Sequence, residues 1–385
     1  MSEIKQGYKQ TKVGIIPEDW EDIKIKDIVK VSQGLQIAID DRFTTPAHNR
    51  VFYITIPFIE GKKEEYIENP KSSTLCKKDD ILVVRTGSGV GKIIRGVEGA
   101  FHNNFFKVKP SDNINIDFFY YFLTSPRVQF LMAKYAGNSA IPDLNHGDFY
   151  SLDFLIPPLK EQEKIAEILT TWDEAITKQT ELLRAKELQK KALMQKLLSG
   201  EVRFSGFSDE WEEVRLGEIC EIKKGEQLNK DTLENDGEFP VINGGIEPSG
   251  FTDEWNTEAN TITISEGGNS CGYVNFLQNK FWSGGHCYTL LNLQIDKIFL
   301  YQFLKYNQHN IMKLRVGSGL PNIQKSTIEK FTVSKPSFAE QQKIAEVLSL
   351  ADDETNLLKN ELEELKLQKK ALMQKLLTGE VRVKV

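Results

Sequence analysis

The sequence predicts an α+β fold: two globular mixed α/β domains separated by two long helices that form an antiparallel intramolecular coiled coil with pseudo-two-fold symmetry. The first observation behind this is an exact repeat, because Leu188–Leu198 recurs unchanged as Leu367–Leu377. The second is the extent of the match, which runs without a gap from Pro157–Phe204 onto Pro336–Val383 at a constant offset of 179 residues. A repeat of this length indicates that one unit, roughly half the chain, is duplicated in tandem.

The two globular domains are predicted at residues 1–157 and 204–335. Each opens with an acidic residue followed by Trp-Glu, at Trp20 and at Trp211. Short β-rich runs punctuated by Gly and Asn fill their middles, as at Asp80–Arg85 and Asn260–Ser265. The ends of the two domains match again at the 179-residue offset, while the middles diverge. This pattern is typical of two readers of different ligands built on one scaffold.

The two long helices are predicted at residues 158–203 and 336–385. After Pro157-Pro158 about forty residues follow without Gly or Pro, and Gly200 stands where a C-terminal helix cap is expected. Apolar residues recur at alternating spacings of three and four in both copies, which is a heptad seam. A helix with one narrow apolar stripe needs a partner, and the other copy lies in the same chain. Antiparallel pairing makes the repeats equivalent and is therefore favoured.

Composition and charge limit the classes of function. The chain has 385 residues, 40% of them hydrophobic and 27% charged, with a formal net charge of −6. The excess of acidic residues lies in 204–335, so bulk electrostatics favours only modest affinity for a polyanion. No apolar run reaches the ~20 residues of a membrane helix and no signal peptide is visible, which favours a cytoplasmic protein. The four cysteines show no metal-ligand spacing and are expected to be reduced.

These features resemble the specificity subunit of type I restriction-modification enzymes. The resemblance depends on the order domain–helix–domain–helix, on the repeated helix ends, and on the Trp-Glu openings. It implies that residues 1–157 and 204–335 are target recognition domains, each reading half of a bipartite, interrupted DNA sequence. It also implies that 158–203 and 336–385 are spacer helices that dock two modification (methyltransferase) subunits, with restriction (translocase and nuclease) subunits joining outside them.

Candidate DNA-contacting residues are polar or basic groups in loops of the two domains. They are Arg85, Thr86, Ser88, Lys92, Asn103, Asn104, Asn138, Ser139 and Asn145 in the first domain, and Asn243, Glu266, Asn269, Lys280, Arg315, Ser318 and Asn322 in the second. Asn pairs with adenine, Arg with guanine, and a carboxylate accepts from cytosine N4. Any one of them also suits a solvated loop or an Asx turn.

The stretch Arg85–Lys92 has the most suggestive spacing for chemistry. Gly87 and Gly91 have three residues between them and Lys92 precedes Ile93, so the pattern departs from a nucleotide-binding P-loop. Two readings remain open. The stretch is either a strand-to-strand turn with positive-φ glycines or a DNA-facing loop in which glycine permits close backbone approach.

Partner-docking candidates are the lysines of the repeated helix ends, namely Lys190, Lys191, Lys196, Lys369, Lys370 and Lys375. The chain shows no amino-methyltransferase, nuclease or ATPase motif, and its five histidines lack metal-ligand spacing. A non-catalytic subunit without a bound cofactor is therefore expected. S-adenosylmethionine, ATP and Mg²⁺ would belong to the partner subunits. The alternative is a coiled-coil scaffold that joins two protein partners without reading DNA.

Overall fold

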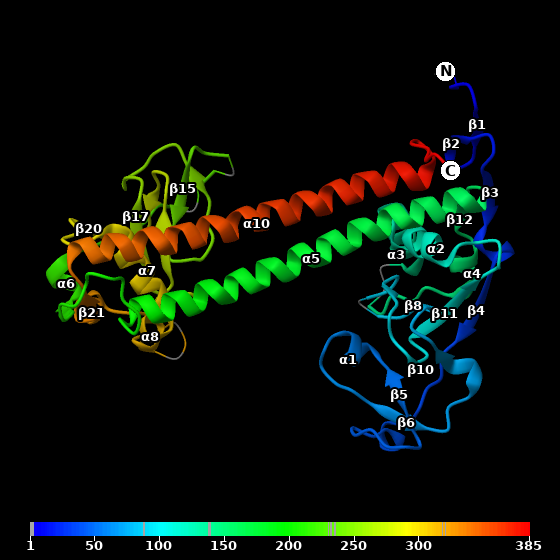
Figure 1. The fold of residues 1–385 in the computed structure, drawn as a ribbon, viewed down its shortest axis with the longest axis horizontal. Coiled ribbons are helices and arrows are strands. Elements are labelled where there is room, and N and C mark those ends of the chain that lie inside the picture. The colour runs from blue at the N-terminus through cyan, green and yellow to red at the C-terminus, as the bar shows by residue number, and fades with distance from the viewer. Residues whose placement is uncertain are drawn as a thin grey trace. The chain divides into compact units, whose positions relative to one another are not determined.

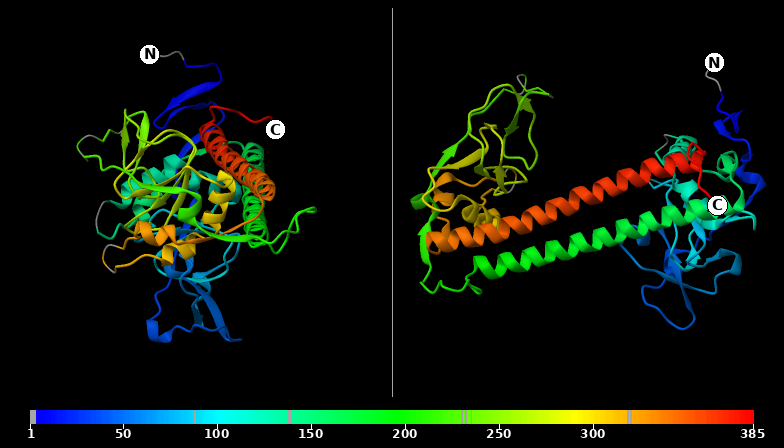
Figure 2. Two further views of the ribbon diagram at one scale, coloured as in Figure 1. Left: turned by 90° about the vertical axis from the view of Figure 1, so that its left-hand side faces the viewer. Right: turned by 45° about the horizontal axis from the view of Figure 1, so that its top comes forward.

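A computed structural model describes residues 4–87, 89–137, 140–229, 231, 233–234, 236–317, 319 and 321–385 (Figure 1). The chain divides into two compact units. Unit 1 comprises Met1–Lys178 with Leu362–Val385, and unit 2 comprises Gln179–Glu361. Two helices, α5 (Leu159–Leu198) and α10 (Phe338–Thr378), are continuous and give one half to each unit (Figure 2). The prediction of two long helices is confirmed.

The ends of these helices follow from local sequence. Gly200 and Gly379 both have φ of +73°, the left-handed conformation that terminates a helix and favours glycine. Beyond each glycine the chain turns back, and Val202 N donates to Lys196 O at 3.1 Å while Val381 N donates to Lys375 O at 3.2 Å. The repeated sequence therefore produces the same cap twice.

Within each unit the N-terminal half of one helix packs against the C-terminal half of the other. In unit 1, Ile165 and Leu169 of α5 share a buried core with Leu376 of α10. In unit 2, Ile344 and Leu348 of α10 share a core with Leu197 of α5. The pairing is antiparallel inside each unit, as predicted, and the two seams use residues related by the 179-residue offset.

The described residues in the globular part of unit 1 form two four-stranded sheets, a strand pair and an N-terminal hairpin. One sheet has the order β4-β11-β8-β9 and is antiparallel, and the other has the order β6-β5-β10-β7 with β5 and β10 parallel. The strands are β1 Tyr8–Thr11, β2 Gly14–Pro17, β3 Glu21–Lys24, β4 Val29–Gln33, β5 Arg50–Ile54, β6 Tyr66–Glu68, β7 Leu75–Cys76, β8 Ile81–Val84, β9 Ile93–Ile94, β10 Gly99–Phe101, β11 Phe105–Pro110 and β12 Asp153–Ile156. Strand β12 pairs with β3.

Unit 2 repeats this plan in reduced form. Its antiparallel sheet β14-β20-β17-β18 matches β4-β11-β8-β9, its three-stranded sheet β16-β15-β19 again contains one parallel pair, and β13 pairs with β21. The strands are β13 Glu212–Arg215, β14 Glu221–Lys224, β15 Phe239–Ile242, β16 Phe251–Thr252, β17 Thr261–Ser265, β18 Val274–Leu277, β19 Trp282–Ser283, β20 Cys287–Leu291 and β21 Thr332–Lys335. Both domains are mixed α/β, which confirms the predicted fold class.

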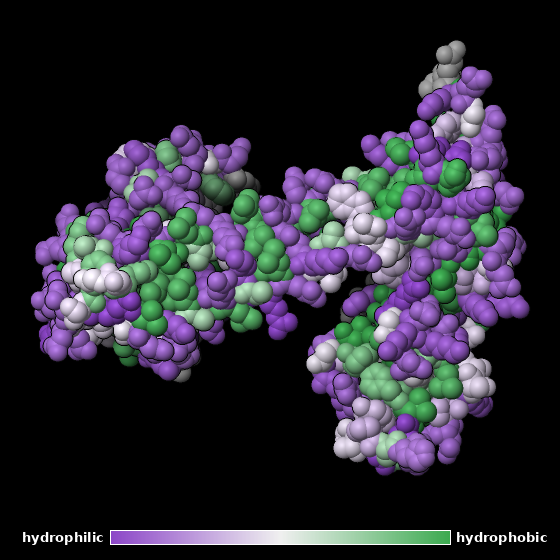
Figure 3. Space-filling view, viewed as in Figure 1, coloured by the Kyte–Doolittle hydropathy of each residue, from purple (hydrophilic) through white to green (hydrophobic). Residues whose placement is uncertain are grey.

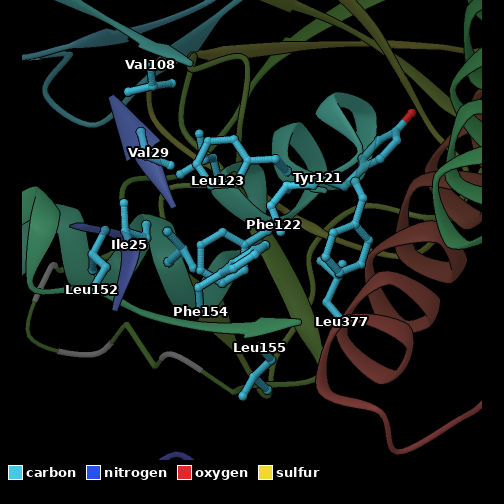
Figure 4. Close-up of a cluster of buried hydrophobic side chains, with 14 of the residues drawn as sticks. Ile25, Val29, Val108, Tyr121, Phe122, Leu123, Leu152, Phe154, Leu155 and Leu377 are labelled. Carbon is cyan, nitrogen blue, oxygen red and sulfur yellow. The ribbon is translucent and has the colours of Figure 1, made fainter. Parts of the chain in front are cut away.

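Short helices join each sheet to the long helices. They are α1 Ile56–Ile59, α2 Ile116–Thr124, α3 Pro126–Ala136 and α4 His146–Tyr150 in unit 1, and α6 Leu216–Ile219, α7 Lys297–Tyr306, α8 Gln308–Lys313 and α9 Lys325–Glu329 in unit 2. Helix α2 carries Phe122 and Leu123 into a core shared with Phe154 of β12 and Leu377 of α10 (Figure 4). Helix α7 occupies the matching place in unit 2, where Phe299 and Leu300 are fully buried.

A buried glutamine in each unit fixes the start of the α2 or α7 helix to the long helix. Gln162 accepts a hydrogen bond from Asn115 N at 2.8 Å and donates to Pro157 O at 2.9 Å. Gln341, its repeat partner, accepts from Asp296 N at 2.8 Å and donates to Pro336 O at 2.7 Å. These residues belong to the repeated Glu-Gln pair, so the repeat specifies how each domain is attached.

In each unit a buried glutamate near the start of one long helix accepts hydrogen bonds from an arginine just beyond the end of the other long helix. We call this arrangement the helix-end clasp. Arg382 Nε and Nη2 donate to Glu161 at 2.7 and 2.8 Å, and Trp20 Nε1 donates to the same carboxylate at 2.9 Å. In unit 2, Arg203 Nε and Nη2 donate to Glu340 at 2.9 and 2.7 Å. Both carboxylates are buried, with exposed fractions of 1% and 0%.

Candidate nucleic-acid interface

In each four-stranded antiparallel sheet, one of the two inner strands, β8 or β17, is followed by a loop that is hydrogen-bonded to a proline turn. In unit 1 the loop follows β8, where Gly87 N donates to Pro142 O at 3.0 Å and Leu144 N donates to Arg85 O at 2.9 Å. Gly87 has φ of +100° and Gly91 of +82°, so the positive-φ glycines expected from the sequence are present. The loop is a strand-to-strand turn held in place by the Pro142 segment.

Unit 2 reproduces this frame 179 to 181 residues later. Gly268 N donates to Pro321 O at 3.0 Å, and Ile323 N donates to Glu266 O at 2.8 Å. A β-bridge joins Gly267 to Asn322, as one joins Thr86 to Asp143 in unit 1. We call each arrangement a loop station: residues 85–87 with 142–144 in unit 1, and 266–268 with 321–323 in unit 2.

The loop station of unit 1 carries a cation at its centre. Arg85 Nε and Nη2 donate to the two oxygens of Asp143 at 3.0 and 3.1 Å, and Thr86 Oγ1 donates to Asp143 Oδ1 at 2.7 Å. Partial burial opposes ionisation of this carboxyl, but the hydrogen bonds from Thr86 and Arg85 prevail and lower the pKa of Asp143. The Arg85 side chain is 34% exposed and remains accessible beside its partner.

The loop station of unit 2 carries a carboxylate in the matching position. Glu266 is 7% exposed and accepts from Lys224 Nζ at 2.6 Å, from Tyr288 OH at 3.0 Å and from His286 Nδ1 at 3.2 Å. Burial works against its charge, yet the hydrogen bonds from Lys224, Tyr288 and His286 lower the pKa of Glu266. The groups that solvent reaches at this station include Asn322, which is exposed, and the side chains of Lys224 and His286, which are 50% and 62% exposed.

Several predicted residues lie around these stations. Asn104 O accepts from Arg85 N at 2.7 Å, and Asn103 Nδ2 donates to Gln36 at 3.1 Å. Asn243 Oδ1 accepts from His286 N at 3.2 Å, which places it at the unit 2 station. Asn322 replaces Asp143. The structure thus brings Asn104, Asn243 and Asn322 to the stations, and Asn103 precedes Asn104 in the chain, although contact with DNA stays a prediction for each of these four residues.

Other predicted residues are placed differently. Asn145 caps helix α4 by accepting from Asp148 N at 2.9 Å, so it serves the frame. Lys280 lies 3.7 Å from the Trp255 ring centroid, beside the smaller sheet. Lys92, Asn269 and Arg315 are exposed in loops. Ser88, Asn138, Ser139 and Ser318 lie outside the described residues.

The helix lysines fall into two groups. Lys369 pairs with Asp173 at 2.5 Å in unit 1, and Lys190 pairs with Asp352 in unit 2, again at the repeat offset. Each of these carboxylates also accepts from the short helix beside it, Asp173 from Tyr121 OH at 2.8 Å and Asp352 from Gln302 Nε2 at 2.5 Å. The remaining four lysines are exposed, namely Lys191, Lys196, Lys370 and Lys375.

Sequence reasoning missed Asp143 of the unit 1 station and two residues that donate to Glu266 of the unit 2 station, namely Lys224 and Tyr288. Asp143 could have been found, because it stands opposite Asn322 in the repeat, beside the two proline turns. Lys224 and Tyr288 come from β14 and β20, whose pairing brings Tyr288 opposite Lys224. No short-range pattern signals that pairing, since 64 residues separate them.

Among the described residues, no group of three or more His, Cys, Asp or Glu could hold a metal ion. The cysteines are buried, and burial raises the pKa of Cys76 to about 11, which suppresses the thiolate. In the same part of the chain, every helix is too short or too polar to cross a membrane.

Known proteins that are similar in sequence match both copies of the repeat in this chain. A family model described as the type I restriction modification DNA specificity domain matches residues 17–185 and 208–367, one match per repeat. The type I restriction enzyme MjaVIII specificity subunit of Methanocaldococcus jannaschii is 24% identical over 424 residues, covering 99% of this chain and 97% of that protein. The MjaIX specificity subunit of the same organism is 23% identical over 421 residues, covering 98% and 96%.

A solved structure shares the fold. It is the crystal structure of the S subunit of a type I restriction-modification system from M. genitalium, which matches with a TM-score of 0.64 and 24% identity. The match covers 93% of this chain and 96% of that one. The domain–helix–domain–helix order is therefore found beyond this sequence.

Proposed function

Because the chain belongs to the type I restriction modification DNA specificity family, we propose that it reads a bipartite, interrupted DNA target, with one half-site contacted by each domain. The observation that carries this proposal is the pair of loop stations. Both use the same backbone frame, but one presents Arg85 with Asp143 and the other presents Lys224 and His286 around Glu266. Two domains that recognise different DNA sequences require different polar side chains, and they can present these on the same backbone arrangement.

At the unit 1 station, Arg85 is the proposed base-reading group. Asp143 orients the Arg85 guanidinium through Nε and Nη2, and Nη1 takes no part in that ion pair. Bidentate recognition of guanine O6 and N7 by arginine is the commonest specific contact in the major groove. Thr86 and Asp143 would act by holding the guanidinium in orientation.

At the unit 2 station, Lys224 and His286 are the proposed contacts with DNA. Glu266 already accepts from three donors, so a base could reach it only by displacing one of them. We therefore assign Glu266 a positioning role, and we assign donation to base acceptors or phosphate to the accessible Lys224 and His286.

Modification subunits are the proposed partners of the long helices. The repeat keeps three exposed apolar positions in each unit: Leu159, Leu367 and Val381 in unit 1, and Phe338, Leu188 and Val202 in unit 2. Green apolar patches also interrupt the mostly purple face of α10 in Figure 3. Two equal sets of exposed apolar side chains suit two copies of one partner.

The proposed role is non-catalytic. Methyl transfer and DNA cleavage would be carried out by the modification and restriction subunits, which would hold S-adenosylmethionine, ATP and Mg²⁺. This chain would supply sequence recognition and the attachment surface. Its net charge of −6 implies that basic surfaces on the partners contribute much of the attraction to DNA phosphates.

The experiment is to co-express the full chain with its modification subunit and map the methylated motif on a random DNA library. A bipartite motif with an indifferent gap is expected. Arg85→Ala should relax one half-site, at a cost of about 1–3 kcal/mol, and leave the other intact. Lys224→Ala should affect only the other half-site.

The matched control is Lys134→Ala, which replaces an exposed lysine of α3 in unit 1 that is not among the candidate DNA contacts. It should keep the motif. Methylation by this chain without its partner would contradict the non-catalytic role. Relaxation of both half-sites by Arg85→Ala in a well-folded protein would contradict independent reading by the two domains.

A further inference from the structure

A basic cavity in unit 2 is not used by the loop station. It lies where α5 and α10 meet the end of α7 and has a volume of about 440 Å³. Four lysines line it, Lys190, Lys191, Lys305 and Lys359, together with a single carboxylate, Glu187. All of these residues belong to unit 2.

Two of the four lysines are neutralised inside the unit. Lys359 pairs with Glu187 at 3.0 Å, and Lys190 pairs with Asp352. Asp352 also accepts from Gln302, so its oxygens are occupied. The lining and its ion-pair partners therefore contain four positive and two negative charges, and two positive charges are left uncompensated.

Lys305 is one of the uncompensated cations. Its side chain is half-buried, and Nζ donates to Val274 O at 2.8 Å and Gln308 Oε1 at 3.0 Å and lies 4.0 Å from the Tyr273 ring centroid. All three partners are neutral, and no carboxylate among the described residues pairs with it. Burial, with Lys190 nearby, lowers the pKa of Lys305 to about 8. A partly buried cation without a counter-charge is costly, and an anion would reduce that cost.

Lys191 is the second uncompensated cation. It is an exposed residue of α5 that lines the cavity and has no ion-pair partner in the described part of the chain. Lysine is a compact point charge on a flexible stem, suited to binding phosphate. Two uncompensated cations in the lining of one cavity match the charge of a phosphate dianion.

The matching place in unit 1 has a different character. Lys191 corresponds to Lys370, but the positions that answer Lys305 and Lys359 are Thr124 and Thr180. A cavity of about 350 Å³ in unit 1 is lined largely by apolar side chains, among them Phe122, Val128, Phe130, Leu155 and Leu377. Two of the four lysines therefore have no lysine counterpart in the described part of unit 1, whereas a surface for a partner that docks twice would be repeated.

We propose that this cavity binds a phosphate-bearing ligand, held by Lys191 and Lys305 and flanked by the paired Lys190 and Lys359. The phosphate comes either from the backbone of bound DNA or from a free phosphorylated small molecule. The site is independent of sequence reading, since none of its residues belongs to a loop station.

The first test is isothermal titration of the full chain with inorganic pyrophosphate at constant ionic strength. Saturable binding of one equivalent is expected. Lys191→Gln should weaken it about tenfold or more, the loss of one charge-assisted contact. Lys370→Gln, the same change at the repeat position, should leave the affinity within about twofold. Unchanged thermal melting of both variants shows that folding is intact.

The second test identifies the source of the phosphate. The affinity of the full chain for duplex DNA is measured as a function of salt. If the cavity contacts the DNA backbone, Lys191→Gln lowers the slope of log K against log salt by about one and Lys370→Gln does not. Pyrophosphate binding with an unchanged slope assigns the site to a free phosphorylated molecule. Absence of both effects, or equal losses in the two variants, overturns the proposal.

Discussion

Units 1 and 2 share a backbone frame but complete it with different side chains, as their helix-end clasps show. Glu161 accepts from both Arg382 and Trp20, whereas Glu340 accepts from Arg203 alone among the described side chains. The indole N–H of Trp211, the counterpart of Trp20, is buried and lacks an acceptor within the described residues. The repeated segments therefore fix the position of each clasp, while residues outside them decide how completely it is satisfied.

The cores differ in the same way. Phe154 of unit 1 packs edge-on against Phe122 and Phe119, with ring centroids 4.4 and 5.5 Å apart. Its counterpart at the repeat offset is Val333, also fully buried. Unit 1 thus places an aromatic cluster where unit 2 places a small aliphatic side chain. Equal topology is reached with unequal packing, which makes the two units a matched pair for testing stability.

The largest effect is expected from truncating this core position. Phe154→Ala should destabilise unit 1 by about 3–5 kcal/mol, because it removes a fully buried ring and leaves a cavity among rigid neighbours. Val333→Ala removes fewer atoms and should cost unit 2 clearly less. Hydrogen exchange read by mass spectrometry, combined with urea unfolding, reports on each unit separately.

Phe154→Leu serves as the control, since it keeps an apolar side chain and should recover much of the lost stability. Equal losses from Phe154→Ala and Val333→Ala would show that the aromatic cluster contributes no more than its aliphatic counterpart.

The clasps are expected to give the next largest difference. Glu161→Ala leaves the Trp20 N–H buried without an acceptor, a cost of about 1–3 kcal/mol beyond the lost ion pair. Glu340→Ala removes no indole acceptor, because Trp211 has none to lose. Unit 1 should therefore be destabilised more by its variant than unit 2 by the corresponding one, as measured by the same exchange experiment.

Replacing each tryptophan separates the indole from the arginine. Trp20→Phe should destabilise unit 1, since it removes the donor to Glu161. Trp211→Phe should be nearly neutral or stabilising, because it removes an unsatisfied donor. If both substitutions had equal effects, the hydrogen bond from Trp20 would not be the source of the asymmetry.

The sequence predicted the shared frame because the frame is repeated. Glu161 with Glu340, Gln162 with Gln341, and the caps Gly200 and Gly379 all lie inside the matched segments, and their roles recur in both units. Heptad spacing also identified the seam residues, since burial of a helix face leaves a periodic signal. The fold class and the long helices could therefore be derived before any coordinates.

The loop stations could be predicted only in part. The glycines and proline turns revealed the loops, but the partners of Arg85 and Glu266 depend on long-range strand pairing. Asp143 lies 58 residues from Arg85, and Lys224 lies 42 residues from Glu266. Side-chain pairing at such separations is a tertiary property that local patterns do not encode. For that reason the contacts of Lys224 and Tyr288 with Glu266 became visible only in the structure.

The last expected effect is a pH dependence that arises from Lys305 in unit 2. In the folded state, burial and, to a lesser extent, the positive charge of Lys190 lower the pKa of Lys305 from 10.5 to about 8. Between pH 8 and 10.5 the unfolded chain holds this proton and the folded chain releases it. The unfolded state then binds more protons, so the free energy of unfolding rises with pH across that window. Below pH 8 both states are protonated, and the cost of the buried charge is constant.

Lys305→Met should remove this rise, because methionine keeps the apolar stem and has no proton to release. The difference in unfolding free energy between the wild type and this variant should therefore grow from pH 8 to pH 10, as followed by urea unfolding at several pH values. Thr124→Met, the same replacement at the counterpart position of unit 1, should show a flat difference, because threonine has no proton that titrates in this range. If the curves of unfolding free energy against pH were parallel for the wild type and Lys305→Met, Lys305 would not be desolvated in the folded state. The difference between Lys305 and Thr124 of unit 1 would then have no effect on the pH dependence of stability.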